Sequence, residues 1–166
     1  MQGLFDFKKK IKFPIFEKHQ KQKGFTVLSI QRTLCIIKPD AVKKGVSGSI
    51  LQMILDAGFS VRGMKLVQLS EAQAGKFYEV HKERPFYKDL VAFMTSGPVI
   101  PIALEKEEAV SSWRKLIGAT DPAEAEEGTI RKKFAASKGE NAVHGSDSEE
   151  NGKIEVGFFF AESELV

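Results

Sequence analysis

The chain has 166 residues, of which 28% are charged and 42% are hydrophobic, with one cysteine and a formal net charge of +3. This length and composition indicate one globular domain with a sizeable core, and no apolar run approaches the length of a membrane span. The single cysteine excludes an internal disulfide and is typical of a reducing compartment, so we expect a cytoplasmic protein.

The excess positive charge lies in the N-terminal segment. Residues 1–31 hold seven lysines against Asp6 and Glu17, a net charge of +5, which leaves −2 for residues 32–166. We therefore expect a basic, flexible extension followed by one domain over 32–166. The preferred interpretation of the extension is an upstream segment of little function. An organelle-targeting peptide is an alternative that we do not favour, because such peptides are rich in Arg and Ser, and an amphipathic membrane or partner segment is another.

The first expected strand covers residues 32–38, which are apolar and β-branched. Lys38 closes it immediately before a proline, and the end of a buried strand is a common place for ligand-binding groups. Cys35 lies inside this run, where packing is a better interpretation than reactivity. Helical spacing follows over residues 50–55, with Gly58 as the expected stop, and residues 59–69 are expected to form a second strand.

Ser70 and Gln73 have the spacing of a capping box, which predicts a helix from there to about His81. A second short helix is expected around residues 90–93, a strand over 99–104, and a helix over 107–117 that stops at Gly118. Residues 119–140 form the longest irregular segment, and long ordered loops in compact domains are often functional. This loop carries Thr120 and Arg131, which are suitable donors to phosphate.

The segment Asn141-Ala142-Val143-His144-Gly145-Ser146-Asp147 holds one of only three histidines. The spacing of Ser146 and Glu149 predicts a helix start, so His144 would directly precede a helix N-terminus, where free N–H groups attract anions. We interpret His144 as a phosphate-accepting nucleophile, although a loop or core histidine with one hydrogen bond is the more frequent situation. The chain has no phosphate loop, no GxGxxG and no Cys/His cluster, so a nucleotide would bind in another mode.

Three motifs in one chain resemble the nucleoside diphosphate kinase family. They are Lys38-Pro39-Asp40, Arg84-Pro85-Phe86 and Asn141-x-x-His144-Gly145-Ser146-Asp147. Their order and spacing agree with the family, and the resemblance covers about residues 32–160. It implies a ferredoxin-like α/β (α+β) sandwich, in which helices flank a four-stranded antiparallel sheet, and self-association as a hexamer or tetramer.

The resemblance also implies a reaction. The γ-phosphate of a nucleoside triphosphate such as ATP passes to the histidine and then to a nucleoside diphosphate, by a ping-pong mechanism with little base selectivity. Magnesium is held mainly through the nucleotide phosphates, without a dedicated metal site on the protein. The implied catalytic residues are His144, Lys38, Glu155, Ser146 and Tyr78. The implied nucleotide-binding residues are Lys38, Phe86, Arg114, Thr120, Arg131 and Asn141. Ala41 replaces the glycine usual in the family, which raises the question of local loop geometry.

Two other functions remain as alternatives. The first is a nucleic-acid-binding or regulatory module that acts through the basic, aromatic extension. For the domain itself we do not expect nucleic-acid binding, because its charge is nearly balanced. The second alternative is transfer of phosphate from His144 to protein partners. A complete set of Lys38, Arg114, Arg131, His144 and Glu155 favours the enzyme, since a binding protein needs no nucleophile.

Overall fold

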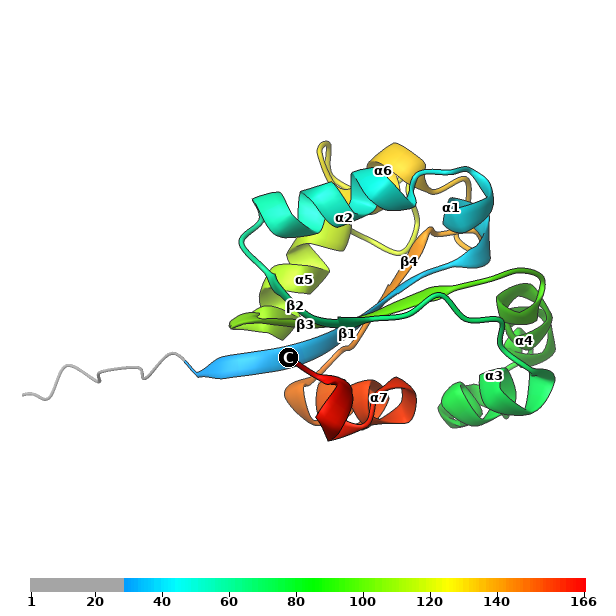
Figure 1. Ribbon diagram of the computed structural model, residues 1–166. Coiled ribbons are helices and arrows are strands. Elements are labelled where there is room, and N and C mark those ends of the chain that lie inside the picture. Colours follow the sequence, from blue (N-terminus) through cyan, green and yellow to red (C-terminus); the bar gives the residue numbers. More distant parts are fainter. Residues whose placement is uncertain (1–28) are drawn as a thin grey trace, which may run out of the picture.

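The computed structural model describes residues 29–166, which form a four-stranded antiparallel sheet with helices on both faces (Figure 1). The strand order is β2-β3-β1-β4, in which β1 is Ile30–Ile37, β2 is Ser60–Met64, β3 is Ile100–Glu107 and β4 is Val143–Gly145. The expected sandwich fold is confirmed. Residues 1–28, most of the expected extension, lie outside the described residues, and β1 begins two residues before the expected domain boundary.

The helices divide between the two faces of the sheet (Figure 1). One face carries α1 (Pro39–Lys43), α2 (Ser47–Asp56), α5 (Ala109–Ile117) and α6 (Ile130–Phe134). The other face carries α3 (Glu71–Phe77), α4 (Tyr87–Thr95) and α7 (Glu149–Phe159), together with the short 3-10 turns η1 (Glu79–His81) and η2 (Glu162–Glu164). Each helix in the described range is too short or too polar to cross a membrane.

Alternation along β1 supplies both halves of the core. Leu34 and Ile36 pack with the α3, α4 and α7 side, whereas Cys35 and Ile37 pack with the α2 and α5 side, as the two-residue period of a strand requires. All four side chains are buried. Burial raises the pKa of the Cys35 thiol, so this cysteine is a packing residue, as expected.

Several local signals predicted the element ends correctly. Gly58 and Gly118 follow α2 and α5 with φ of 76° and 80°, a left-handed conformation that glycine adopts without strain. Ser70 and Gln73 form the expected capping box of α3. Expected and observed ends differ at several other elements; for example, β3 runs to Glu107, where a helix was expected to begin. The largest errors of extent concern two segments. The strand expected over 59–69 ends at Met64, followed by an isolated bridge at Val67, and the loop expected over 119–140 contains α6.

Candidate active site

His144 lies in the middle of β4, where it pairs with Ile36 of β1. The expectation that it directly precedes a helix was wrong. The helix begins at Glu149, and its cap is Ser148, whose hydroxyl accepts from the backbone N–H of Asn151 at 3.1 Å. The strand therefore fixes the backbone of the histidine, and the free N–H groups of α7 lie further along the chain.

Ser146 is fully buried, and it links His144 to the neighbouring strand and helix. Its hydroxyl accepts from the backbone N–H of Leu34 at 3.0 Å and donates to Oε2 of Glu155 at 2.6 Å. Because both contacts hold the hydroxyl inside the core, Ser146 is not available to cap the helix. The spacing of Ser146 and Glu149 suggested a helix cap, but the Ser146 hydroxyl is instead part of a buried hydrogen-bond network.

The His144 side chain is held through one ring nitrogen. Its Nε2 lies 2.9 Å from Oε2 of Glu155 in α7. A carboxylate at that position favours the tautomer with the hydrogen on Nε2, which leaves Nδ1 with a lone pair. In addition, the Trp113 indole donates to the His144 carbonyl at 3.2 Å. The arrangement presents an oriented imidazole whose unprotonated nitrogen is Nδ1.

A tight turn immediately before β4 sets the direction in which the chain enters the strand that carries His144. Ala142 is buried and has φ of 64°, and the Val143 N–H donates across it to the Asn141 carbonyl at 2.7 Å. This i to i+2 bond defines a γ-turn, which with positive φ is rare and strained. Asp40 holds the turn by accepting from the Ala142 N–H at 3.0 Å, and the Lys38 N–H donates to the Ala142 carbonyl at 2.9 Å.

The Lys38 side chain is buried beside the turn, with only 6% of the residue exposed. Its Nζ donates to Oδ1 of Asn141 at 2.7 Å. Burial, reinforced by the charge of Arg131, lowers its pKa to about 8, while the opposite charge of Asp40 acts against this shift. Nearby, Ala41 is buried within α1 and does not have positive φ, so the departure from the family glycine leaves the loop unstrained.

Arg131 projects from α6 and joins three backbone carbonyls. Its Nε donates to Asn141 at 3.3 Å, Nη1 to Gly118 at 2.9 Å and Nη2 to Val143 at 3.0 Å. Burial and the nearby charge of Arg114 lower its pKa to about 10. Three of its five N–H donors are thereby engaged, and two remain for a ligand.

The residues described so far form the His144 cluster, which comprises Lys38, Arg131, Asn141, His144, Ser146 and Glu155. The remaining predicted residues differ in whether they contact this cluster. Tyr78 is buried, and its ring centroid lies 6.2 Å from that of His144; burial and the charge of Glu155 raise its pKa. Arg114 and Thr120 are exposed, and Phe86 is 50% exposed with its ring 5.7 Å from that of His81. Within residues 29–166, no hydrogen bond joins Phe86 or Thr120 to the His144 cluster.

Sequence reasoning missed two residues that contact this histidine. Phe77 places its ring 5.4 Å from the imidazole, and Trp113 bonds the histidine carbonyl. The apolar spacing of the helix over 107–117 identifies Trp113 as buried but not its indole partner. For Phe77, adjacency to Tyr78 was the available signal.

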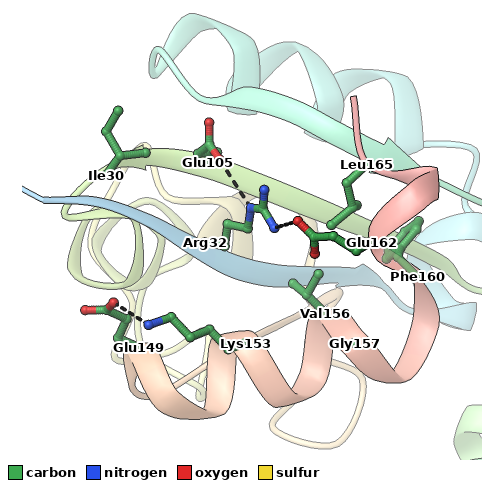
Figure 2. Close-up of a pocket in the computed structure, with 10 residues that line it drawn as sticks. All are labelled: Ile30, Arg32, Glu105, Glu149, Lys153, Val156, Gly157, Phe160, Glu162 and Leu165. Atoms are coloured by element: carbon green, nitrogen blue, oxygen red, sulfur yellow. Dashed lines mark hydrogen bonds and ion pairs between the residues drawn. The ribbon is translucent and has the colours of Figure 1, made fainter.

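A cavity of about 490 Å³ lies away from this cluster, between β1, α7 and the C-terminal residues (Figure 2). Figure 2 shows Arg32 between Glu105 and Glu162, to which it donates at 3.2 and 2.8 Å. None of the predicted catalytic or nucleotide-binding residues lines this cavity, so the candidate active site is the His144 cluster.

Comparisons with known proteins place the chain among enzymes that transfer phosphate between nucleotides. The family model described as nucleoside diphosphate kinase matches residues 31–165. The nucleoside diphosphate kinase of Chloroherpeton thalassium is 60% identical over 137 residues, which cover 82% of this chain and 97% of that protein. The chain belongs to the nucleoside diphosphate kinase family.

Solved structures agree with this assignment. The crystal structure of the Aquifex aeolicus nucleoside diphosphate kinase matches with a TM-score of 0.82 and 44% identity, over 83% of this chain and all of that one. A halophilic nucleoside diphosphate kinase from Halobacterium salinarum, in complex with CDP, matches with a TM-score of 0.80 and 37% identity, over 83% of this chain and 92% of that one.

Proposed function

We propose that His144 carries the phosphate between the two nucleotides of a ping-pong reaction. In the first half, Nδ1 attacks the γ-phosphorus of a nucleoside triphosphate such as ATP. A P–N bond forms, the bond to the β-phosphate oxygen breaks, and a nucleoside diphosphate leaves. In the second half, a terminal β-phosphate oxygen of another nucleoside diphosphate attacks the phosphorus, an O–P bond forms, the P–N bond breaks, and the free histidine is restored. The observation that carries this proposal is the Glu155 contact at Nε2, which leaves Nδ1 as the nucleophile.

Glu155 and Ser146 support this role of His144. The carboxylate stabilises the positive charge that develops on the imidazole during attack, and the Ser146 hydroxyl holds the same oxygen at 2.6 Å. Tyr78 is buried, and its ring packs edge-to-face near the His144 imidazole, so it contributes an apolar wall to the site.

For the phosphates we propose Lys38, Arg114, Thr120 and Arg131 as the donors. Phosphoryl transfer depends mainly on positioning and neutralisation of charge. Within residues 29–166 no group of three or more His, Cys, Asp or Glu side chains is suited to hold a metal ion, whereas cationic side chains gather at the turn. This composition, with cationic side chains and without an acidic cluster, fits a magnesium ion whose ligands are mainly phosphate oxygens, the hard ligands that this ion prefers. When bound, it would neutralise phosphate charge.

For the nucleoside we propose Phe86 and Asn141. The exposed ring of Phe86 offers a stacking face, which every base is able to use. Asn141 already donates to Lys138 and accepts from Lys38, and its second amide hydrogen remains for the sugar. Low base selectivity follows, because neither contact reads a base edge. That the halobacterial relative binds CDP is consistent with this proposal.

We also propose self-association as a hexamer or tetramer and a cytoplasmic location. β2 is an edge strand of the sheet, and Met64 and Leu66 near its end are exposed apolar residues, a combination typical of subunit contacts. The absence of a second cysteine for Cys35 in the whole sequence agrees with a reducing compartment. Analytical ultracentrifugation of the full chain distinguishes six copies from four, and a monomer would contradict the proposal.

The deciding experiment is to incubate the protein with γ-labelled ATP and magnesium, remove the nucleotide, and measure acid-labile, base-stable label. We expect label on the wild type, on His19→Ala and on His81→Ala, and none on His144→Ala. Added GDP should discharge it. Absence of label on folded wild type would contradict the phosphohistidine route. Deletion of residues 1–28 should leave the label unchanged, and loss of label would instead favour a role for the extension.

A further inference from the structure

The imidazole of His144 has an aromatic wall on the side of α3. Phe77, the last residue of α3, places its ring 5.4 Å from the imidazole, with the two planes at 75°. This is an edge-to-face contact of the kind that aromatic rings favour. Tyr78 contacts the imidazole in a similar way at 6.2 Å and 85°. The hydrogen bond from Nε2 to Glu155 is therefore accompanied by two ring contacts.

Phe77 is itself fixed by the helix that carries the glutamate. Its ring lies 5.3 Å from Phe158 and 5.2 Å from Phe159, and it packs perpendicular to Tyr78 at 4.8 Å. Phe158 and Phe159 belong to α7, as does Glu155. The carboxylate that holds Nε2 and two of the aromatic residues that pack on Phe77 thus belong to one helix. This cluster ties α3 and α7 to each other around the histidine.

A single hydrogen bond fixes one atom of the imidazole but leaves the ring free to pivot about that atom. Ring contacts with the imidazole restrict this pivot, because rotation of the imidazole would disturb its packing against the Phe77 ring. The direction of Nδ1 matters more than its mere availability, since the incoming phosphorus must lie in line with the lone pair.

We propose that Phe77 is a positioning residue that holds the His144 imidazole with Nε2 toward Glu155 and Nδ1 toward the phosphate. This inference rests on the phosphohistidine route proposed above and adds a residue to it. Phe77 makes no hydrogen bond through its side chain and lies outside the group of phosphate donors. Its effect is therefore on the rate of phosphate transfer and not on nucleotide affinity.

The test compares Phe77→Leu with Phe158→Leu. Both changes replace one ring of the same cluster by a smaller apolar side chain, but only Phe77 has a ring contact with His144. We measure the single-turnover rate of phosphoenzyme formation and, separately, nucleotide affinity. Phe77→Leu should slow phosphoenzyme formation roughly tenfold. A displacement of a reacting group by about 1 Å can lower the reaction rate by about a hundredfold, and the loss of one of two ring contacts should displace Nδ1 by less. The nucleotide affinity of Phe77→Leu should remain close to wild type. Phe158→Leu should lose much less rate, because Tyr78 and Phe159 still pack against Phe77, and its nucleotide affinity should also remain close to wild type. Phe77→Tyr keeps the ring and should restore the rate.

A second readout does not depend on catalysis. The ¹⁵N chemical shifts of the His144 ring distinguish the nitrogen that carries hydrogen from the bare one, and Phe77→Leu should mix the two tautomers while Phe158→Leu should not. Equal losses of rate in both variants, or an unchanged rate and unchanged shifts in Phe77→Leu, would overturn the inference. If the wild type accepts no label at all, the proposed route fails, and the ¹⁵N shifts still decide whether Phe77 orients the ring.

Discussion

As the pH rises through the titration of Lys38, the stability of the wild type should rise and its nucleotide affinity should fall, and replacing Lys38 by methionine should remove both pH dependences. The pKa of this buried lysine is lowered from 10.5 to about 8, so the folded protein releases this proton before the unfolded chain does. Between these two pH values the unfolded chain binds more protons, and the wild-type free energy of unfolding therefore rises with pH. Lys38→Met removes this contribution and should show no such rise.

The size of the effect follows from the two pKa values. Each pKa unit corresponds to about 1.4 kcal/mol, so wild type should gain up to ~3 kcal/mol relative to Lys38→Met between about pH 8 and 10.5. Nucleotide affinity should fall over the same window, because a neutral lysine no longer attracts phosphate. Below about pH 8 both quantities should be nearly independent of this residue's titration.

The assay is denaturant unfolding across this pH range, with nucleotide affinity measured in parallel. Lys43→Met is the matched control, because Lys43 is an exposed lysine at the end of α1, the helix that Lys38 directly precedes. It removes the same formal charge without removing a buried one. If wild type and Lys38→Met had parallel pH dependences of unfolding, or if wild-type affinity rose above about pH 8, the reasoning about Lys38 would be wrong.

Three other substitutions test the His144 cluster. In Gly145→Ala, a Cβ would lie 2.5 Å from the Trp113 indole nitrogen, so thermal unfolding should show a loss of about 1–3 kcal/mol; an unchanged midpoint would contradict this packing. Glu155→Gln allows an amide N–H to face Nε2 of His144 and favours the wrong tautomer, so kcat should fall by on the order of 10²–10⁴-fold with the fold retained; near-wild-type turnover would argue against the orienting role. Arg131→Ala removes a hydrogen-bond donor from three carbonyls, of which that of Asn141 still accepts from the Val143 N–H, so unfolding in urea should show a loss of about 2–3 kcal/mol, whereas a residue that only touched phosphate would leave stability unchanged.

Much of the fold could be predicted from the sequence because strong local signals agreed with tertiary packing. The capping box at Ser70 and the glycine stops at Gly58 and Gly118 are local devices, and each occurs where expected. The β4 strand and α6 were not predicted, since they are three and five residues long and too short to show a period.

The structure brings several of the predicted site residues together around His144, but their geometry could not be predicted from the sequence. Ser146 has the spacing of a helix cap, yet its hydroxyl is taken by Leu34 and Glu155, partners that no local pattern reveals. The strained turn at Ala142 likewise depends on Asp40, which is distant in sequence. Positive φ at an alanine contradicts its own preference, so only the tertiary contacts explain it.

The contacts that shape this site span most of the domain. Ser146 meets Leu34 across 112 residues of sequence, and Asn141 meets Lys38 across 103. Closing such long loops is slow compared with forming helices. During refolding, helical signal should therefore return before the ability to accept phosphate, and on the ribosome the histidine should become competent only after α7 has been released. Recovery of phosphate acceptance would thus report completion of the last stage of folding.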